Sequence, residues 1–117
     1  MSATTVYTQA STLITSSSDS GSLSVGNYTE LAIDVNITSN QGSSPTIQYF
    51  VDRLGADGIW YPMWQSTTVS SSTAQISVSI GVGLSYPLSF AGTVRFRWSI
   101  GGTSTPGFTY SVSIIGK

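Results

Sequence analysis

The chain has 117 residues, of which 39% are hydrophobic and only 8% are charged, and its formal net charge is −1 at pH 7. This length predicts one domain with a single core, and the apolar content with so low a net charge argues against disorder. The four basic residues provide no positive field for a phosphate backbone, so nucleic-acid binding is not expected. No apolar run is long enough to cross a membrane. The first residues lack the features of a secretory signal, so synthesis in a cytoplasm is expected.

The residue types that are missing exclude most enzyme chemistry. Histidine and cysteine are both absent, which removes serine–histidine and cysteine–histidine nucleophiles, thiolate metal sites and disulfides. The carboxylates are Asp19, Glu30, Asp34, Asp52 and Asp57, and we expect each to be solvated or paired across strands rather than to form a glycosidase pair. Asp52 and Asp57 lie close in sequence without a third acid beside them, which is a weak signal for calcium. We therefore expect no enzyme activity, no catalytic residue, no metal and no cofactor.

The N-terminal segment predicts a weak strand over residues 4–15, because Val6 and Ile14 share one parity with polar residues between them. Its thin apolar face suits an edge strand or an arm that lies on a neighbouring molecule. A loop rich in serine and glycine follows it. We therefore expect residues 1–25 to form an N-terminal arm or edge strand with this loop, and residues 26–117 to form the main domain.

Two strong strands come next along the chain. Glu30–Thr38 and Thr46–Leu54 alternate apolar and polar side chains, which predicts strands with one buried face. The polar residues Ser39–Ser44 between them predict a turn. Asp57-Gly58 predicts a tight hairpin turn, and Pro62 places the returning strand at an edge or a bulge, because proline cannot donate to the ladder.

Three more strands complete the pattern. Gln75–Ile80, Val94–Ile100 and Phe108–Ile114 alternate in the same way, and a longer loop is expected over residues 81–91. Seven or eight such strands predict an all-β fold, an antiparallel β-sandwich of the jelly-roll or immunoglobulin-like kind, in one domain. The expected core consists of the inward-facing residues Leu31, Ile33, Val35, Ile37, Ile47, Tyr49, Val51, Ile76, Val78, Val94, Phe96, Trp98, Phe108, Tyr110 and Val112.

Two arginines share the outward face of a strand whose other face is core. Arg95 and Arg97 are expected either to pair with Asp34 or Glu30 across the sheet or to bind carboxylates of a partner, for which the planar guanidinium is suited. Both alternatives are open at this point.

A group of aromatic residues follows the Asp-Gly turn. Trp60, Tyr61 and Trp64 lie close together in sequence, and exposed aromatic side chains on a sandwich can stack on sugar rings. A sandwich also needs large core residues, so one or both tryptophans are expected in the core, with Tyr61 exposed.

Three segments resemble a known family. Residues 44–47 (Ser-Pro-Thr-Ile), residues 57–61 (Asp-Gly-Ile-Trp-Tyr) and residues 92–113, with their arginine–aromatic strand and Gly-Gly-Thr-Ser turn, resemble small structural proteins of tailed-bacteriophage virions. The resemblance covers residues 28–117. It implies a virion protein on the capsid surface, a decoration (cement) protein that binds the major capsid protein. The alternatives are a tail-associated adhesion domain or a carbohydrate-binding module that binds a glycan.

The N-terminal strand also carries an expectation about assembly. Its unpaired main-chain groups would offer a template to another chain, so we expect the segment Ala3–Thr15 to pack on a neighbouring subunit or the capsid in a homo-oligomer, a trimer. Val6, Tyr7 and Ile14 would set the register of that contact. With Arg95, Arg97 and Tyr61 they are the expected partner-binding residues.

Overall fold

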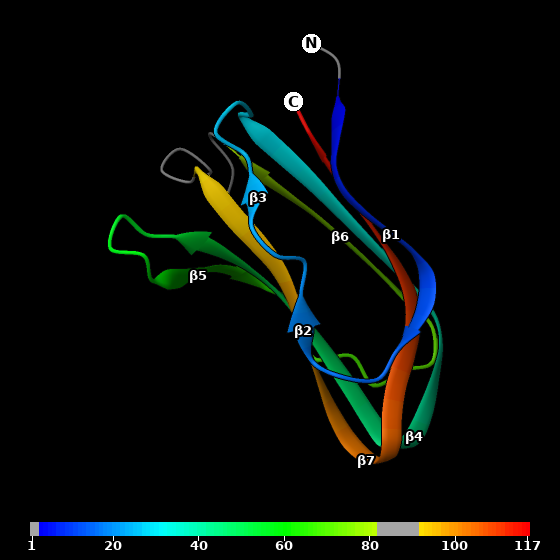
Figure 1. Cartoon of the computed structure of the whole chain (residues 1–117). Coiled ribbons are helices and arrows are strands. Elements are labelled where there is room, and N and C mark those ends of the chain that lie inside the picture. Colours follow the sequence, from blue (N-terminus) through cyan, green and yellow to red (C-terminus); the bar gives the residue numbers. More distant parts are fainter. Residues whose placement is uncertain (1–2, 82–91) are drawn as a thin grey trace.

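The computed structural model describes residues 3–81 and 92–117, and all regular structure in these two ranges is β (Figure 1). The strands are β1 (Thr4–Ile14), β2 (Ser18–Asp19), β3 (Leu23–Ser24), β4 (Glu30–Leu54), β5 (Trp60–Gln65), β6 (Ala74–Gly81) and β7 (Thr93–Gly116). Every pairing is antiparallel, and all seven strands belong to one sheet. The prediction of an all-β antiparallel fold is therefore confirmed. The loop expected over residues 81–91 lies outside the described residues from residue 82 onward.

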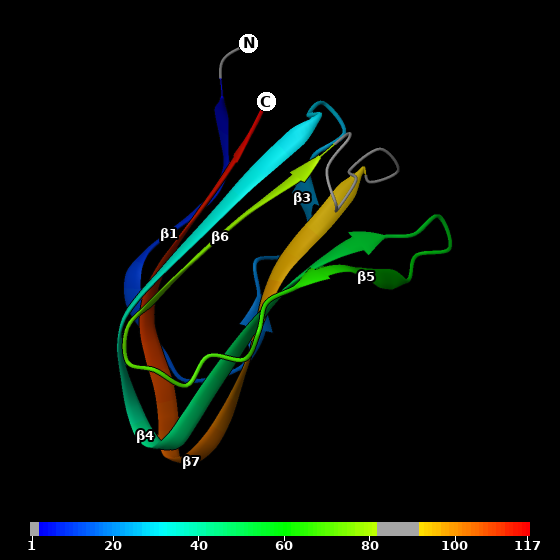
Figure 2. The same cartoon turned by 180° about the vertical axis from the view of Figure 1, so that it is seen from behind.

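The spine of the molecule is a ribbon made of β4 and β7, which pair from Leu31 opposite Gly116 to Arg53 opposite Val94. Both strands turn sharply at the same end of the molecule, so the sheet folds back on itself (Figures 1 and 2). We call the two halves leaves. The first leaf holds β1, β6, the start of β4 and the end of β7, and the second leaf holds β2, β3, β5 and the remaining halves of β4 and β7.

The bend is built from residues with left-handed backbone conformations. Gly42 in β4 has φ +93° and Gly102 in β7 has φ +122°, in the region that glycine adopts without steric cost. A Cβ atom on Gly42 would lie 2.7 Å from the backbone Cα of Pro106, so the two strands approach closely here. The turn predicted at Ser39–Ser44 is thus a bend within the continuous strand β4, because β4 pairs with β7 both before and after it.

The core lies between the leaves. Tyr49 of the second leaf meets Tyr110 of the first edge-to-face, with ring centroids 5.2 Å apart, and Tyr49 stacks on Phe96 at 5.5 Å. Thirteen of the fifteen predicted core residues are buried, but Ile76 and Val78 are only half-buried because β6 pairs on one side only among the described residues. Ile80 and Ile114, which continue the alternation of their strands, are buried as well, and so is Trp64, one of the two tryptophans expected in the core; Val25 is buried and was not predicted.

The N-terminal strand is an edge strand of the chain's own sheet, which was one of its two expected roles, and its expected contact with a neighbouring subunit or the capsid stays a prediction. β1 does not leave its own domain, because it pairs with β7 from Thr4 opposite Gly116 to Ile14 opposite Phe108. Val6, Tyr7 and Ile14 are half-buried and pack against the chain's own core. The main-chain hydrogen bonds between β1 and β7 stabilise this strand although few of its side chains are apolar. Such main-chain pairing leaves no pattern in the side chains from which it could be predicted. A trimeric assembly stays a prediction.

Candidate partner-binding face

A hairpin projects from the body of the molecule where β4 ends and β5 begins (Figure 1). Its turn is the predicted Asp57-Gly58, with Gly58 at φ +82°. The Asp57 carboxylate accepts the backbone N–H of Ile59 at 3.0 Å and the hydroxyl of Tyr61 at 2.5 Å. The hydrogen bond from Tyr61 lowers the pKa of Asp57 and raises the pKa of Tyr61. These two hydrogen bonds to the Asp57 carboxylate therefore stabilise the conformation of the turn.

At the base of the hairpin, one buried carboxylate binds two arginines. Asp52 is only 2% exposed, and its Oδ2 accepts Nε of Arg95 at 2.9 Å and Nε of Arg97 at 2.6 Å. The sequence prediction named Asp34 or Glu30 as the partner, and that is wrong. Those two acids lie on the first leaf, whereas the fold of the sheet brings the arginines opposite the second half of β4.

Each guanidinium also lies over an aromatic ring. Arg95 Cζ is 4.7 Å from the centroid of Trp60, and Arg97 Cζ is 3.9 Å from that of Phe50. Carboxylate and ring together hold each guanidinium plane in one orientation, while its Nη groups keep hydrogen-bond donors to offer. We call Phe50, Asp52, Trp60, Arg95 and Arg97 the arginine–aromatic face.

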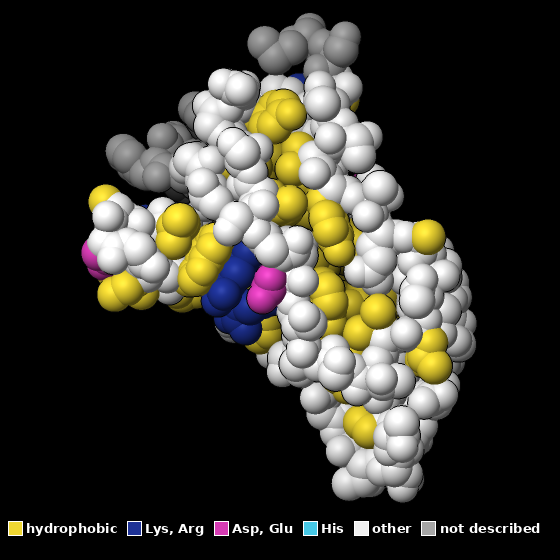
Figure 3. All heavy atoms as spheres, in the orientation of Figure 1, with side chains coloured by type: hydrophobic (Ala, Val, Ile, Leu, Met, Phe, Trp, Pro, Cys, Tyr) yellow, Lys and Arg dark blue, Asp and Glu magenta, His cyan; other side chains and the backbone are white. Residues whose placement is uncertain are grey.

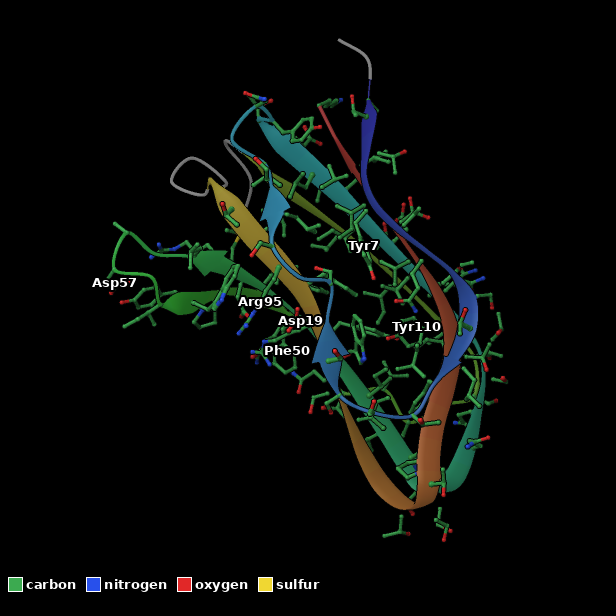
Figure 4. All side chains as sticks on the ribbon, viewed as in Figure 1. Tyr7, Asp19, Phe50, Asp57, Arg95 and Tyr110 are labelled. Atoms are coloured by element: carbon green, nitrogen blue, oxygen red, sulfur yellow. The ribbon has the colours of Figure 1, made fainter. Side chains whose placement is uncertain are left out.

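The surroundings of this face are mixed in charge. The Arg95 and Phe50 side chains lie together at the base of the hairpin, with Asp19 of β2 beside them and Asp57 far off at the tip (Figure 4). Asp19 stands opposite Arg97 in the ladder. The space-filling view shows the basic patch between hydrophobic side chains of the hairpin and an acidic side chain on the body (Figure 3). Paired charges at the base and apolar side chains toward the tip suit a protein partner better than a polyanion.

The aromatic predictions come out as follows. Trp64 is buried at 8% exposure and Trp60 is half-buried, so at least one tryptophan is in the core. Tyr61 is exposed, as expected, and Arg53 Cζ lies 5.1 Å from its ring centroid. Ile59 is 56% exposed and was not singled out from the sequence. Its position directly after the Asp-Gly turn was the available signal, since turn residues face solvent.

The predicted partner-binding residues fall into two separate groups. Arg95, Arg97 and Tyr61 belong to the second leaf and its hairpin, whereas Val6, Tyr7 and Ile14 belong to β1 on the first leaf. The outer side of the first leaf carries a shallow groove of about 550 Å³, to which all four strands contribute serine, threonine, amide and apolar residues and a single acid, Asp34. Asp34 already accepts the Ser77 hydroxyl at 2.6 Å. Among the described residues, neither a second carboxylate nor a basic side chain lines this groove beside Asp34.

No cluster of three or more potential metal-ligating side chains occurs within residues 3–81 and 92–117. In the same two ranges, no helix is long and apolar enough to span a membrane. Comparison with protein-family models and with curated proteins gives no match for this chain.

Proposed function

We propose that this protein is a bacteriophage virion structural protein that decorates the capsid surface by binding the major capsid protein. The observation that carries the proposal is the projecting hairpin with the arginine–aromatic face at its base, and the strand order supports it. If β4 and β7 are each divided at their bend, the chain has eight segments, with β2 and β3 counted as one. The first leaf then reads first, eighth, third, sixth, and the second leaf reads second, seventh, fourth, fifth.

A two-sheet jelly roll has the same order, and this agreement supports the jelly-roll alternative over the immunoglobulin-like one. Jelly rolls build viral capsid shells and also lectin domains. The fold alone does not choose between these uses, because one fold carries many functions. The choice depends on the projecting hairpin and the arginine–aromatic face.

The hairpin has the composition of a protein-binding surface. Tryptophan, tyrosine and arginine are the residues that dominate protein–protein binding energy, and Trp60, Tyr61 and Arg95 gather here on a surface otherwise rich in serine and threonine. Their geometry is fixed before binding, which lowers the entropic cost of association. Together with the resemblance to virion proteins, this supports capsid attachment through the hairpin.

A carbohydrate-binding module is the second candidate, and the exposed ring of Tyr61 favours it. One ring face of Tyr61 is occupied by Arg53, and one ring face of Trp60 is occupied by Arg95. A sugar could therefore stack only on the other face of each ring. The aromatic surface open to a sugar is thus smaller than expected from the sequence.

Co-sedimentation of the purified protein with capsids that lack it tests the proposal. We expect Ile59→Ser and Tyr61→Ala to weaken binding at least about tenfold each, as interface anchors do. Leu13→Ser is the matched control, because Leu13 is also an exposed apolar residue, at 45%, but lies on β1. Unchanged binding by both hairpin variants would contradict the proposed attachment. Glycan binding that Tyr61→Ala abolishes would instead establish the carbohydrate-binding module.

A further inference from the structure

The edges of the sheet differ in how well they are protected against pairing with another chain. β1 carries two register shifts, and β5 carries Pro62 and one register shift. Bulges, prolines and charges are the devices that blunt an edge strand. β6 has none of them: Ala74–Gly81 contains no charge and no proline, and its pairing with β4 runs without a shift from Glu30 opposite Gly81 to Ile37 opposite Ala74.

The second side of β6 is open in the described part of the chain. Within residues 3–81 and 92–117 only β4 pairs with it, and Figure 2 shows β6 running beside β4 at the margin of the first leaf. Ile76 and Val78, which the alternation placed in the core, remain half-buried here. A regular, uncharged strand with apolar side chains still partly in water is the kind of edge that recruits another strand.

The sequence of β6 is complementary to itself. Residues 76–80 read Ile-Ser-Val-Ser-Ile in both directions. In an antiparallel pair centred on Val78, each Ile76 would stand opposite Ile80 of the other copy, and each Ser77 opposite Ser79. Such a contact is isologous, because the same residues meet from both sides of a two-fold axis.

We infer that β6 pairs with β6 of a second copy of this chain, about a two-fold axis at Val78. The first leaves of the two copies then form one continuous sheet, and the remaining exposed parts of Ile76 and Val78 become covered. The contact is a single strand pair, so it is small and its dimer is weak and concentration-dependent. This dimer does not depend on capsid binding.

Charge substitutions on the outward positions test both the contact and its register, by sedimentation equilibrium. In Ser77→Lys/Ser79→Lys every new lysine faces a lysine of the other copy, and we expect the dimer dissociation constant to rise about tenfold. In Ser77→Lys/Ser79→Glu each lysine faces a glutamate, and the dissociation constant should stay within about threefold of the parent value. The two variants share the change at position 77 and its loss of the hydroxyl contact to Asp34, so that effect cancels.

A cysteine introduced at the axis provides a second measurement. The parent chain has no cysteine, so Val78→Cys under mild oxidation should give a disulfide-linked dimer, whereas Leu13→Cys, exposed on the edge strand β1, should give far less. Three results would overturn the inference. These are a parent chain that stays monomeric up to millimolar concentration, equal dissociation constants for the two charge variants, and equal cross-linking at the two cysteine positions.

Discussion

Two tyrosine hydroxyls lie in the middle of the core without a hydrogen-bond partner in the described part of the chain. They belong to Tyr49 and Tyr110, whose residues are fully buried, and Gln9 Nε2 on β1 is buried without a partner as well. By contrast, the backbone N–H of Tyr49 is satisfied by the buried Ser66 hydroxyl at 3.0 Å. A buried polar group without a partner opposes folding, even where its ring packs well.

Tyr49→Phe therefore removes the free-energy cost of burying an unpaired hydroxyl and keeps the ring contacts with Phe96 and Tyr110. We expect the free energy of unfolding to stay the same or to rise by about 1 kcal/mol. Ser66→Ala is the control, because it breaks a made hydrogen bond and should lower the free energy of unfolding by about 1–2 kcal/mol. Chemical denaturation measures both. A clear loss of stability in Tyr49→Phe would show that the hydroxyl has a partner in solution.

The same two hydroxyls predict the response to alkali. Burial raises the pKa of Tyr49 and of Tyr110 above the ordinary tyrosine value. Above a pH of about 10 the unfolded chain releases these protons and the folded chain keeps them, so stability present below pH 10 is lost as the pH rises. Denaturation at increasing pH should show this fall, and Tyr49→Phe/Tyr110→Phe should flatten it. An unchanged slope in the double variant would contradict the prediction.

At the scale of the elements, the bend in β4 and β7 near Gly42 and Gly102 folds the sheet into two leaves. Gly42→Ala places a methyl group against the Pro106 backbone at a positive φ, whereas Gly21, at φ +79°, has open space around it. We expect Gly21→Ala to cost about 1 kcal/mol from backbone strain alone, and Gly42→Ala about 3 kcal/mol because overpacking is added. Thermal unfolding of the two variants makes the comparison, and equal losses would mean that the contact at the bend relaxes without cost.

β1 is the element whose role the sequence left open between an edge strand and an arm. Deleting residues 1–15 should now destabilise the domain by at least about 3 kcal/mol, because Val6, Tyr7 and Ile14 would no longer cover the core. Deleting only residues 1–3, ahead of the first pair at Thr4, should leave stability unchanged. Calorimetry measures both deletions. A fully stable domain without residues 1–15 would restore the idea of an arm that binds elsewhere.

These elements show which features the sequence can predict. Alternation identified the long strands and most of the core, because side chains alternate strictly across a strand. It left the two-residue strands β2 and β3 in the expected serine- and glycine-rich loop, because they are too short to show a pattern. It did not identify the partner of Arg95 and Arg97, since the leaf on which an acid lies depends on a long-range fold of the sheet. It also could not tell whether β1 is an edge strand of its own sheet or an arm, because pairing through the main chain leaves little trace in side-chain patterning. Val25 was missed because it lies directly before a turn, where the alternation is interrupted.

At the scale of the whole molecule, the first and last strands lie side by side. Thr4 pairs opposite Gly116, and Lys117 exchanges backbone hydrogen bonds with Glu30; Figure 1 shows the start of β1 beside the end of β7. The final strand thus joins the first strand to the first half of β4. Almost the whole chain must be present before the first leaf can form.

Such long-range pairing predicts slow folding, on the order of milliseconds to seconds, because distant segments must meet before contacts compensate the lost chain entropy. Joining the two termini through a short glycine–serine linker would turn β1 and β7 into neighbours along the chain. We expect the cyclised protein to refold several-fold faster and to be more stable than the linear one. Stopped-flow tryptophan fluorescence provides the measurement, since Trp64 and Trp98 are both buried on folding. A linear chain of the same composition, with the linker attached at one end only, is the control. Equal refolding rates for the two would mean that the slow step lies elsewhere, in the closing of the two leaves at the bend.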